Sequence, residues 1–508
     1  MSSPSDTEYM RQLDFPVLKS KVVMSAASVV GLQWLTHCKS SHPKCNDVRL
    51  SARGWHPTRL LDIGEEDSTS WRLCVTSEDE ISPPSALYLT LSYRWSLNPQ
   101  IRLLSSNIGS FRQGQPTANL PILFRDVIDI ARQFSIRYVW IDALCIIQDS
   151  KADWEKEAPT MRHVYSNSAL TIAASGSENP NDTLLHDRNL DFIRPGKVHS
   201  SLFSDEPRPF YIYDKSYWDR QIFEGPLHNR GWVFQERFLS PRVLYFGKHQ
   251  LLWECRTLHR CEIFPEGIPC HWSDKEMDAL IEREDGHDGQ MTLRTFALWI
   301  DLVKQYSNCD LTLPRDKLHA MAGIAKLFEA FTGDEYLAGL WKSRFVDMLD
   351  WRVFSPEPRR SLEYRAPSWS WASIDGPVRP QGSSARAKLL VELMKASVVN
   401  QTSDINAPFA TILSPTGEFT VQLFPDTTDL QFIAGYQLSY LPLKLDYIYG
   451  STGESSPHVI CLILERVTQS PNLPSRYRRL GHFNFYEARG YDIESACFST
   501  EIKEIELI

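Results

Sequence analysis

Long apolar runs are scarce in this chain of 508 residues. The longest early run, residues 22–35, is interrupted by Ser25, Ser28, Gly31 and Gln33, and the chain does not begin with a basic region. A membrane-spanning helix needs about 20 mostly apolar residues, and a secretory signal peptide needs a basic start. We therefore expect neither a membrane span nor a signal peptide, and no membrane partner.

An excess of positive charge is also lacking. The sequence has 54 Lys and Arg residues against 63 Asp and Glu, for a net charge of -9. No basic stretch is long enough to follow a phosphate backbone, so nucleic acid is not an expected partner. The ten cysteines are irregularly spaced, which is typical of free thiols in a reducing cytosol. We expect a cytoplasmic protein.

Several signatures of catalysis are missing. Neither common glycine-rich phosphate loop occurs, which disfavours a nucleotide switch of the P-loop ATPase type. The patterns G-x-S-x-G and H-E-x-x-H are absent, which removes the commonest serine hydrolases and zinc proteases. A thiol hydrolase using Cys145 with His163 is disfavoured, because the apolar neighbours of Cys145 predict that it is buried. No resident cofactor is expected.

The overall composition is that of a globular protein, with 42% hydrophobic and 23% charged residues. Its length corresponds to about three domains. We predict an N-terminal extension, residues 1–80, packed on a core domain, residues 81–260. A helical segment over 285–355 and a β-rich C-terminal region over 364–508 are expected to follow.

The core domain is predicted from the alternation of strand-like and helix-like segments. Buried strands are expected at 87–92, 138–142 and 169–174, and helices at 121–135 and 151–165. A strand, a helix and a second strand joined by short connections indicate a parallel βαβ unit. The predicted fold class is therefore α/β, with a parallel-sheet core.

Polar residues cluster where the predicted strands end. Arg94 follows the first strand, and Asp142, Gln148 and Asp149 follow the second. Open α/β sheets bind ligands at the carboxyl ends of their strands. We therefore expect these four side chains to share one crevice.

A second polar block lies at residues 230–239, which are expected to form a helix. Arg230, Gln235 and Glu236 stand there within an apolar segment. Burying such groups is costly unless they find partners. We expect them to lie close to the loop 142–149, and removal of Glu236 to destabilise the domain.

The helix predicted at 151–165 carries one carboxylate on an otherwise apolar face. Four residues follow one another at steps of three, four and four, which places them on that face: Trp154, Glu157, Met161 and Tyr165. Pro159 must bend or split the helix. Glu157 therefore either skirts the core and reaches water, or is held in a cleft.

Two groups of cysteine and histidine are metal candidates. Cys38, His42 and Cys45 have a Cys-x3-His-x2-Cys spacing, but no second ligand pair follows nearby, and the alternative is a loop of free thiols. The second group fits no standard zinc finger: Cys255, His259, Cys261, Cys270 and His271. We predict no metal, with the first group as the better candidate.

Three blocks of sequence occur in order along the core domain. They are 89–95, Leu-Thr-Leu-Ser-Tyr-Arg-Trp; 140–148, Trp-Ile-Asp-Ala-Leu-Cys-Ile-Ile-Gln; and 230–237, Arg-Gly-Trp-Val-Phe-Gln-Glu-Arg. Together they resemble the fungal heterokaryon-incompatibility (HET) domain. The segments 34–45 and 365–373 are also similar to those of full-length members of this family.

The resemblance implies self/non-self recognition between fused fungal cells, with the domain acting as a trigger of programmed cell death. The family has been likened to Toll/interleukin-1-receptor (TIR) domains, which implies a flavodoxin/TIR-like core with elaborated insertions. Enzymatic TIR domains cleave NAD with a glutamate near a tryptophan. The segment from Trp154 to Glu157 resembles that helix.

Two functions remain open. In the first, the domain hydrolyses NAD or a related nucleotide as its substrate, with Glu157 and Asp142 as catalytic carboxylates. Aromatic walls, arginines and polar groups would bind the substrate: Ser92, Tyr93, Arg94, Trp95, Gln148, Asp149, Trp154, Arg230, Trp232, Gln235 and Glu236. In the second, a non-catalytic signalling adaptor acts through protein partners or self-association, with its aromatic residues as interface anchors.

Overall fold

A computed structural model describes most of the chain. The described residues are 16–51, 54–79, 81, 86–96, 98–201, 208–214, 216–223, 225–269, 275, 277–281, 289–354, 359–360, 364–382, 387–393, 395–399, 402–410, 421–427, 439–449, 455–467, 475–486 and 502–508. The chain divides into two compact units, Met1–Met277 and Asp278–Ile508. Each unit is treated by itself below.

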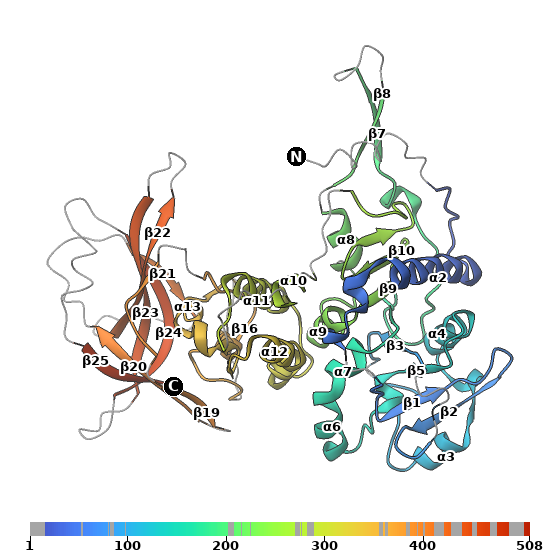
Figure 1. Cartoon of the computed structure of the whole chain (residues 1–508), viewed down its shortest axis with the longest axis horizontal. Coiled ribbons are helices and arrows are strands. Elements are labelled where there is room, and N and C mark those ends of the chain that lie inside the picture. The colour runs from blue at the N-terminus through green and yellow to red at the C-terminus, as the bar shows by residue number, and fades with distance from the viewer. Residues whose placement is uncertain are drawn as a thin grey trace. The chain divides into compact units, whose positions relative to one another are not determined.

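The first unit is built on a sheet of nine strands among its described residues (Figure 1). In spatial order they are β11 (His259–Cys261), β10 (Leu251–Cys255), β9 (Arg242–Phe246), β6 (Leu170–Ala173), β3 (Tyr88–Ser92), β5 (Tyr138–Trp140), β1 (Arg59–Asp62), β2 (Ser70–Val75) and β4 (Gln115–Pro116). The four central strands β9, β6, β3 and β5 run parallel, and the flanking strands are antiparallel. The predicted α/β core is confirmed.

Chain order explains how the parallel strands are arranged. Numbered along the chain, β3, β5, β6 and β9 lie in the spatial order 2-1-3-4, which is how the first four strands of a doubly wound sheet lie. Every residue of these strands is buried. This burial explains why their sequences are continuous apolar runs rather than alternating patterns.

Helices cover both faces of the sheet. On β9, Leu244 faces α2 (Met24–Ser41), because a Cβ on Gly31 would lie 2.8 Å from its side chain. The next side chains, Val243 and Tyr245, pack in a cluster with Val233 of α9 (Gly231–Leu239). Since neighbouring strand residues point to opposite faces, α2 and α9 lie on opposite sides. α4 (Ile122–Gln133) packs beside α2.

The helix predicted at 151–165 is split, as Pro159 requires. It consists of α6 (Lys151–Glu157), a 3-10 turn (Ala158–Thr160) and α7 (Met161–Ser166), and α7 packs against α9. A 3-10 turn has about three residues per turn, so it changes the phase of the side chains. Trp154 is consequently exposed, whereas Glu157, Met161 and Tyr165 are buried. The four residues predicted to share one apolar face therefore differ in their burial.

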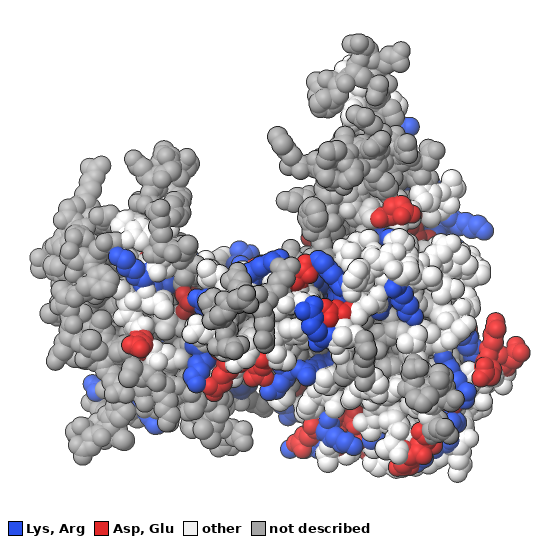
Figure 2. Space-filling model, viewed as in Figure 1, with Lys and Arg blue, Asp and Glu red and all other residues white. Residues whose placement is uncertain are grey.

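Shorter elements complete the first unit. They are α3 (Ile108–Gln113), α5 (Asp142–Cys145), α8 (Tyr217–Phe223), the antiparallel pair β7 (Gly196–Ser200) and β8 (Arg208–Ile212), and 3-10 turns at Pro43–Asn46, Val48–Leu50, Thr117–Asn119 and Leu190–Phe192. On the face shown in Figure 2, the basic and acidic side chains of this unit's described residues are interspersed. No helix among the described residues has the length and apolarity that crossing a membrane requires.

The second unit begins with helices. They are α10 (Asp278–Ile281), α11 (Leu293–Tyr306), α12 (His319–Thr332) and α13 (Phe345–Met348), with 3-10 turns at Pro314–Lys317, Lys342–Arg344 and Trp371–Ser373. Two-residue strands pair between them: β12 (Tyr336–Leu337) with β13 (Leu340–Trp341), β14 (Arg352–Val353) with β17 (Val378–Arg379), and β15 (Arg359–Arg360) with β16 (Ile374–Asp375). Several tryptophans of this part are fully buried, among them Trp299, Trp341 and Trp371.

A second sheet closes the chain. Its strands lie in the order β18 (Lys388–Leu389), β22 (Ser439–Tyr449), β23 (Ser455–Arg466), β24 (Ser475–Tyr486), β25 (Ile502–Leu507), β20 (Thr402–Ala410) and β19 (Lys395–Val399), and β21 (Val421–Pro425) also pairs with β24. A helical segment followed by a β-rich region is therefore confirmed.

Candidate functional site

The centre of the parallel sheet is where its topology places a ligand site. From β3 the chain crosses to β5 on one side, and it later returns to β6 on the other side. Doubly wound sheets bind ligands at such a switch point, beside the carboxyl ends of the strands. In this chain that edge carries Ser92 and the residues after it, and Asp142 after β5. Arg230, which caps the N-terminus of α9, and Glu236, which lies within α9, join them there.

Glu236 is a buried carboxylate at this edge. It lies in α9 and is 7% exposed, and its Oε2 accepts a hydrogen bond of 2.5 Å from the Ser92 hydroxyl. The Tyr165 hydroxyl of α7 also acts on it as a hydrogen-bond partner. Burial raises the pKa of Glu236 to about 7, although the Ser92 hydrogen bond opposes the rise. A proton at this position is therefore exchangeable near neutral pH.

Asp142 is a second acid close to Glu236. Its Oδ2 accepts a 2.7 Å hydrogen bond from the Trp95 indole, and its Oδ1 accepts one from its neighbouring backbone amide, that of Ala143. Burial raises its pKa, against the effect of these donors. The charge of Asp142 in turn contributes to the raised pKa of Glu236. The two acids therefore influence each other's ionisation.

Aromatic and cationic groups surround the two acids. The rings of Tyr93 and Trp95 are stacked, with centroids 6.5 Å apart and planes inclined by 16°. Arg230 Nη1 donates a 3.0 Å hydrogen bond to the Tyr93 carbonyl oxygen, and its charge favours ionisation of both Asp142 and Glu236. The sequence-based expectation that the 230–239 helix approaches the segment after β5 holds for Arg230 and Glu236.

Comparison with protein families identifies the segment that holds this cluster. Residues 88–236 match the family described as heterokaryon incompatibility protein (HET). This segment is a HET domain. The match runs from the first residue of β3 to Glu236, so it encloses Ser92, Asp142 and Arg230. The domain supports a role related to heterokaryon incompatibility. Comparisons with curated proteins and with solved structures find no match to the chain.

Two further predicted residues of the HET domain differ in how deeply they are buried. Gln235 is buried, and Trp232, on the same helix, is half-buried. Both lie on α9, the helix that supplies Glu236. They are therefore on the right element, and their part in ligand binding stays a prediction.

Three other predicted residues have partners of their own. Arg94 is exposed and forms an ion pair of 2.8 Å with Glu178. Gln148 donates through Nε2 to the carbonyl oxygens of Asp142 and Ile146, and these hydrogen bonds stabilise the loop after β5. Asp149 is exposed, and it accepts hydrogen bonds from the backbone and hydroxyl of Ser105. The structure therefore gives these residues separate roles rather than one shared contact.

Glu157 lies at the end of α6, in a different setting. It is 5% exposed, and its Oε1 has no hydrogen-bond partner among the described residues. Burial raises its pKa, while a hydrogen bond from Thr58 and the charge of Arg59 lower it. Those two residues lie at the start of β1, which borders β5 on the side away from β3. The carboxylate is held inside the protein, and its catalytic role stays a prediction.

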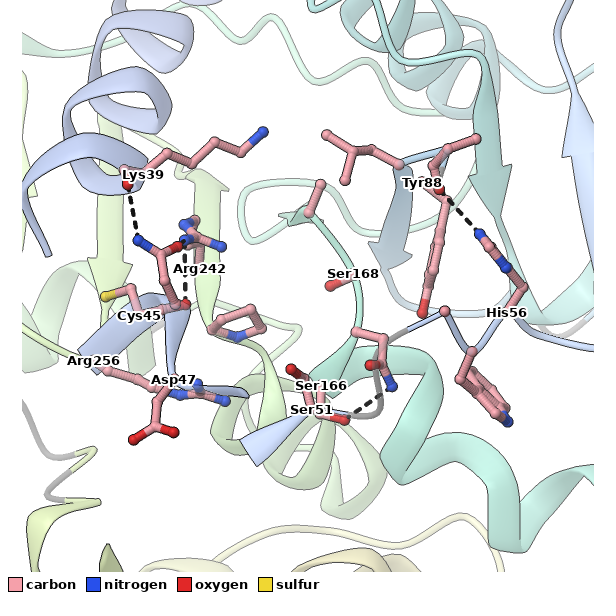
Figure 3. Close-up of a pocket in the computed structure, with 18 residues that line it drawn as sticks. Lys39, Cys45, Asp47, Ser51, His56, Tyr88, Ser166, Ser168, Arg242 and Arg256 are labelled. Carbon is pink, nitrogen blue, oxygen red and sulfur yellow. Dashed lines mark hydrogen bonds between the residues drawn. The ribbon is translucent and has the colours of Figure 1, made fainter. Parts of the chain in front are cut away.

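Among the cavities in the described part of the chain, two of different size border the HET domain. A small one of about 10 Å³, roughly the room for one water, is lined by Tyr93, Trp95, Phe124 and residues around them. A larger one of about 560 Å³ lies at the opposite edge of the sheet, where β3, β6 and β9 begin. In Figure 3, Lys39, Arg242 and Arg256 line one side of it, and Tyr88 and His56 the other.

The larger cavity could not be found from the sequence. Its lining comes from segments near residues 39–56, 86–88, 166–169, 241–242 and 256. No local pattern marks these segments as neighbours, because the tertiary fold alone brings them together. The cations that line it make it suited to an anion, but the two acids with raised pKa, Asp142 and Glu236, lie at the other edge.

Proposed function

We propose that this chain is a heterokaryon-incompatibility-type effector whose HET domain cleaves the N-glycosidic bond of NAD or a related nucleotide, and that this triggers cell death. The observation that carries the proposal is the pair of acids Asp142 and Glu236, both with raised pKa, at the switch point of the sheet. Groups with perturbed pKa values at such a position are candidates for catalysis.

The chemistry requires a negative charge beside the ribose. Departure of neutral nicotinamide leaves an oxocarbenium-like centre at C1 of the ribose, which a carboxylate stabilises. Water then bonds to that carbon and releases a proton, so NAD and water give ADP-ribose, nicotinamide and a proton. In our proposal Asp142 stabilises the cation, and Glu236, with a pKa of about 7, accepts the proton.

The neighbouring groups suit the other parts of the substrate. The stacked Tyr93 and Trp95 offer a flat wall for the nicotinamide base. Arg94 stands between them in the sequence, is exposed and pairs with Glu178, and in our proposal its guanidinium pairs with the pyrophosphate instead. Binding requires side chains that line the small cavity at Tyr93 and Trp95 to move, because it holds only about 10 Å³.

Glu157 is the competing carboxylate. Its position beside Thr58 and Arg59 differs from that of the cluster, yet both Glu157 and Asp142 raise the pKa of Cys145, so both lie near that residue. A buried carboxyl oxygen without a hydrogen-bond partner costs stability, and functional sites tolerate such a cost. Variants of each acid decide between them.

The decisive experiment is incubation of the purified full chain with NAD, with release of nicotinamide measured by chromatography. We expect release by the wild type, and a loss of at least about 100-fold in Asp142→Asn and Glu236→Gln. Glu155→Gln is the matched control, because Glu155 is exposed on the same helix as Glu157. If Glu157→Gln alone abolishes release, the catalytic carboxylate is Glu157 and our assignment of the cluster is wrong.

The alternative function is a non-catalytic adaptor that acts by self-association. The small volume at the cluster favours it, because polar groups that satisfy one another in a closed core can simply specify the fold. This function predicts no nicotinamide release, together with concentration-dependent oligomers in sedimentation experiments. A monomeric chain that releases nicotinamide would contradict it.

A further inference from the structure

Three thiols and one imidazole converge beneath the N-terminal helix. Cys38 lies in the last turn of α2, His42 follows that helix, Cys45 lies in the 3-10 turn Pro43–Asn46, and Cys255 ends β10. All four side chains are buried, and their sulfur and ring-nitrogen atoms lie within 4.8 Å of one another. His42 Nδ1 is 3.5 Å from Cys255 Sγ.

These separations suit one tetrahedral ion. Zinc binds cysteine sulfur at about 2.3 Å and histidine nitrogen at about 2.0–2.1 Å, which places ligand atoms about 3.5–3.8 Å apart. The His42–Cys255 distance already has this value. The widest pair needs to contract by no more than about 1 Å. We propose that Cys38, His42, Cys45 and Cys255 bind a structural zinc ion.

The surrounding charge favours metal-bound thiolates. Three thiolates, a neutral imidazole and a zinc ion carry a net charge of -1. Arg242 is buried and donates from Nε to Cys38 Sγ at 3.2 Å. Arg256, directly after Cys255, is also buried, and the charges of Cys45 and Cys255 act on it. Such second-layer donors orient ligands and stabilise their charge.

The local backbone holds three ligands ready for the ion. The His42 amide donates to the Cys38 carbonyl oxygen, and the Cys45 amide donates to the His42 carbonyl oxygen. Pro43 begins the 3-10 turn that brings Cys45 back towards the helix end. The end of α2 and the turn after it therefore supply three ligands, Cys38, His42 and Cys45, whereas a standard zinc finger uses two separate ligand pairs. β10 supplies the fourth ligand, Cys255.

The site is closed, because four protein ligands leave no position for substrate, and its role is therefore structural. It joins α2, which precedes the HET match, to β10, which follows it. Trp34 of α2 packs against Trp253 of β10, with ring centroids 6.3 Å apart. Zinc would hold α2 against β10 and would fix the position of Cys45, which lines the 560 Å³ cavity.

The proposal is tested first on the wild-type chain, which avoids variants that fail to fold. We expect about one zinc per chain in elemental analysis of protein purified without added metal. Replacement of zinc by Co²⁺ should give thiolate-to-cobalt charge-transfer bands and the strong visible bands of a tetrahedral site. A chain without metal that shows no such bands with Co²⁺, or whose cysteines are joined in a disulfide, would overturn the proposal.

Variants then assign the ligands. Cys255→Ser and His42→Ala should each reduce bound zinc at least tenfold, whereas His42→Cys should retain it, because four thiolates also form a tetrahedral site. Cys74→Ala is the matched control: Cys74 is a buried thiol in β2 of the same unit. Zinc that persists in Cys255→Ser at the wild-type level would exclude β10 from the site.

Discussion

At the scale of single residues, Glu236 links stability to pH. Its pKa rises from an ordinary 4.5 to about 7, chiefly through burial. The folded chain therefore holds this proton more tightly than the unfolded chain does, and ionisation between pH 4.5 and 7 favours unfolding. We expect the free energy of unfolding to fall by up to about 3 kcal/mol across this window, and then to level off.

Urea unfolding of the wild type and of Glu236→Gln at pH 5 and pH 7.5 measures this contribution. The glutamine cannot ionise, so the free energy of unfolding of Glu236→Gln should fall less between these two pH values than that of the wild type, by about 2 kcal/mol. Glu178→Gln provides the control, since Glu178 is exposed. Equal pH dependence in the wild type and in Glu236→Gln would contradict the burial of an exchangeable proton there.

The same residues show how far sequence reasoning reaches. Polar groups within apolar segments marked Glu236, Arg230 and Asp142, because such groups are buried only where they find partners. Cys255 could not be joined to Cys38 in this way. The two are brought together by the packing of α2 on β10, a tertiary contact that no spacing along the chain encodes.

At the scale of elements, a buried ion pair fastens α6 to the sheet. Arg59 of β1 and Asp153 of α6 lie 2.5 Å apart, with side chains 8% and 10% exposed. Arg59 also donates to the Cys145 carbonyl oxygen, and Asp153 accepts from the Ile147 amide. Removing one partner leaves the other charge buried, which typically costs 3–5 kcal/mol, so we expect Arg59→Met to lose about 3 kcal/mol.

Chemical denaturation tests this against an exposed pair of the same helix. Lys151 and Glu155 are 87% and 57% exposed, and Lys151→Met should change the free energy of unfolding by no more than about 0.5 kcal/mol. Similar losses in the two variants would mean that the Arg59 pair does not anchor α6.

The elements themselves were largely predictable. Continuous apolar runs marked β3, β5 and β6 because these strands are covered on both faces, and helical spacing marked α4. The helical spacing from Trp154 to Tyr165 was extended through Pro159, where the 3-10 turn shifts the helical phase. Periodicity holds only while the backbone conformation stays regular.

At the scale of the whole molecule, the two units are expected to unfold in separate steps. Within the second unit, Lys444 Nζ lies 2.6 Å from Asp350 Oδ2, and both side chains are fully buried. This pair connects β22 to the segment after α13. Lys444→Met leaves Asp350 buried without its cationic partner. We expect it to lower the free energy of unfolding of the second unit by about 3 kcal/mol.

Differential scanning calorimetry of the full chain tests this separation. We expect two transitions, of which Lys444→Met lowers one and Arg59→Met the other. A single transition that both variants shift equally would show that the chain unfolds as one cooperative block.

The contact between α2 and β10 can form only late in the synthesis of the chain. The ribosome completes α2 at Ser41 and reaches β10 only at Leu251. At about 5–20 residues per second, the helix waits roughly 10–40 seconds for the strand that it will cover. During that time the Trp34 side chain lacks its partner Trp253, so we expect the nascent chain to depend on chaperones until residue 255 has emerged.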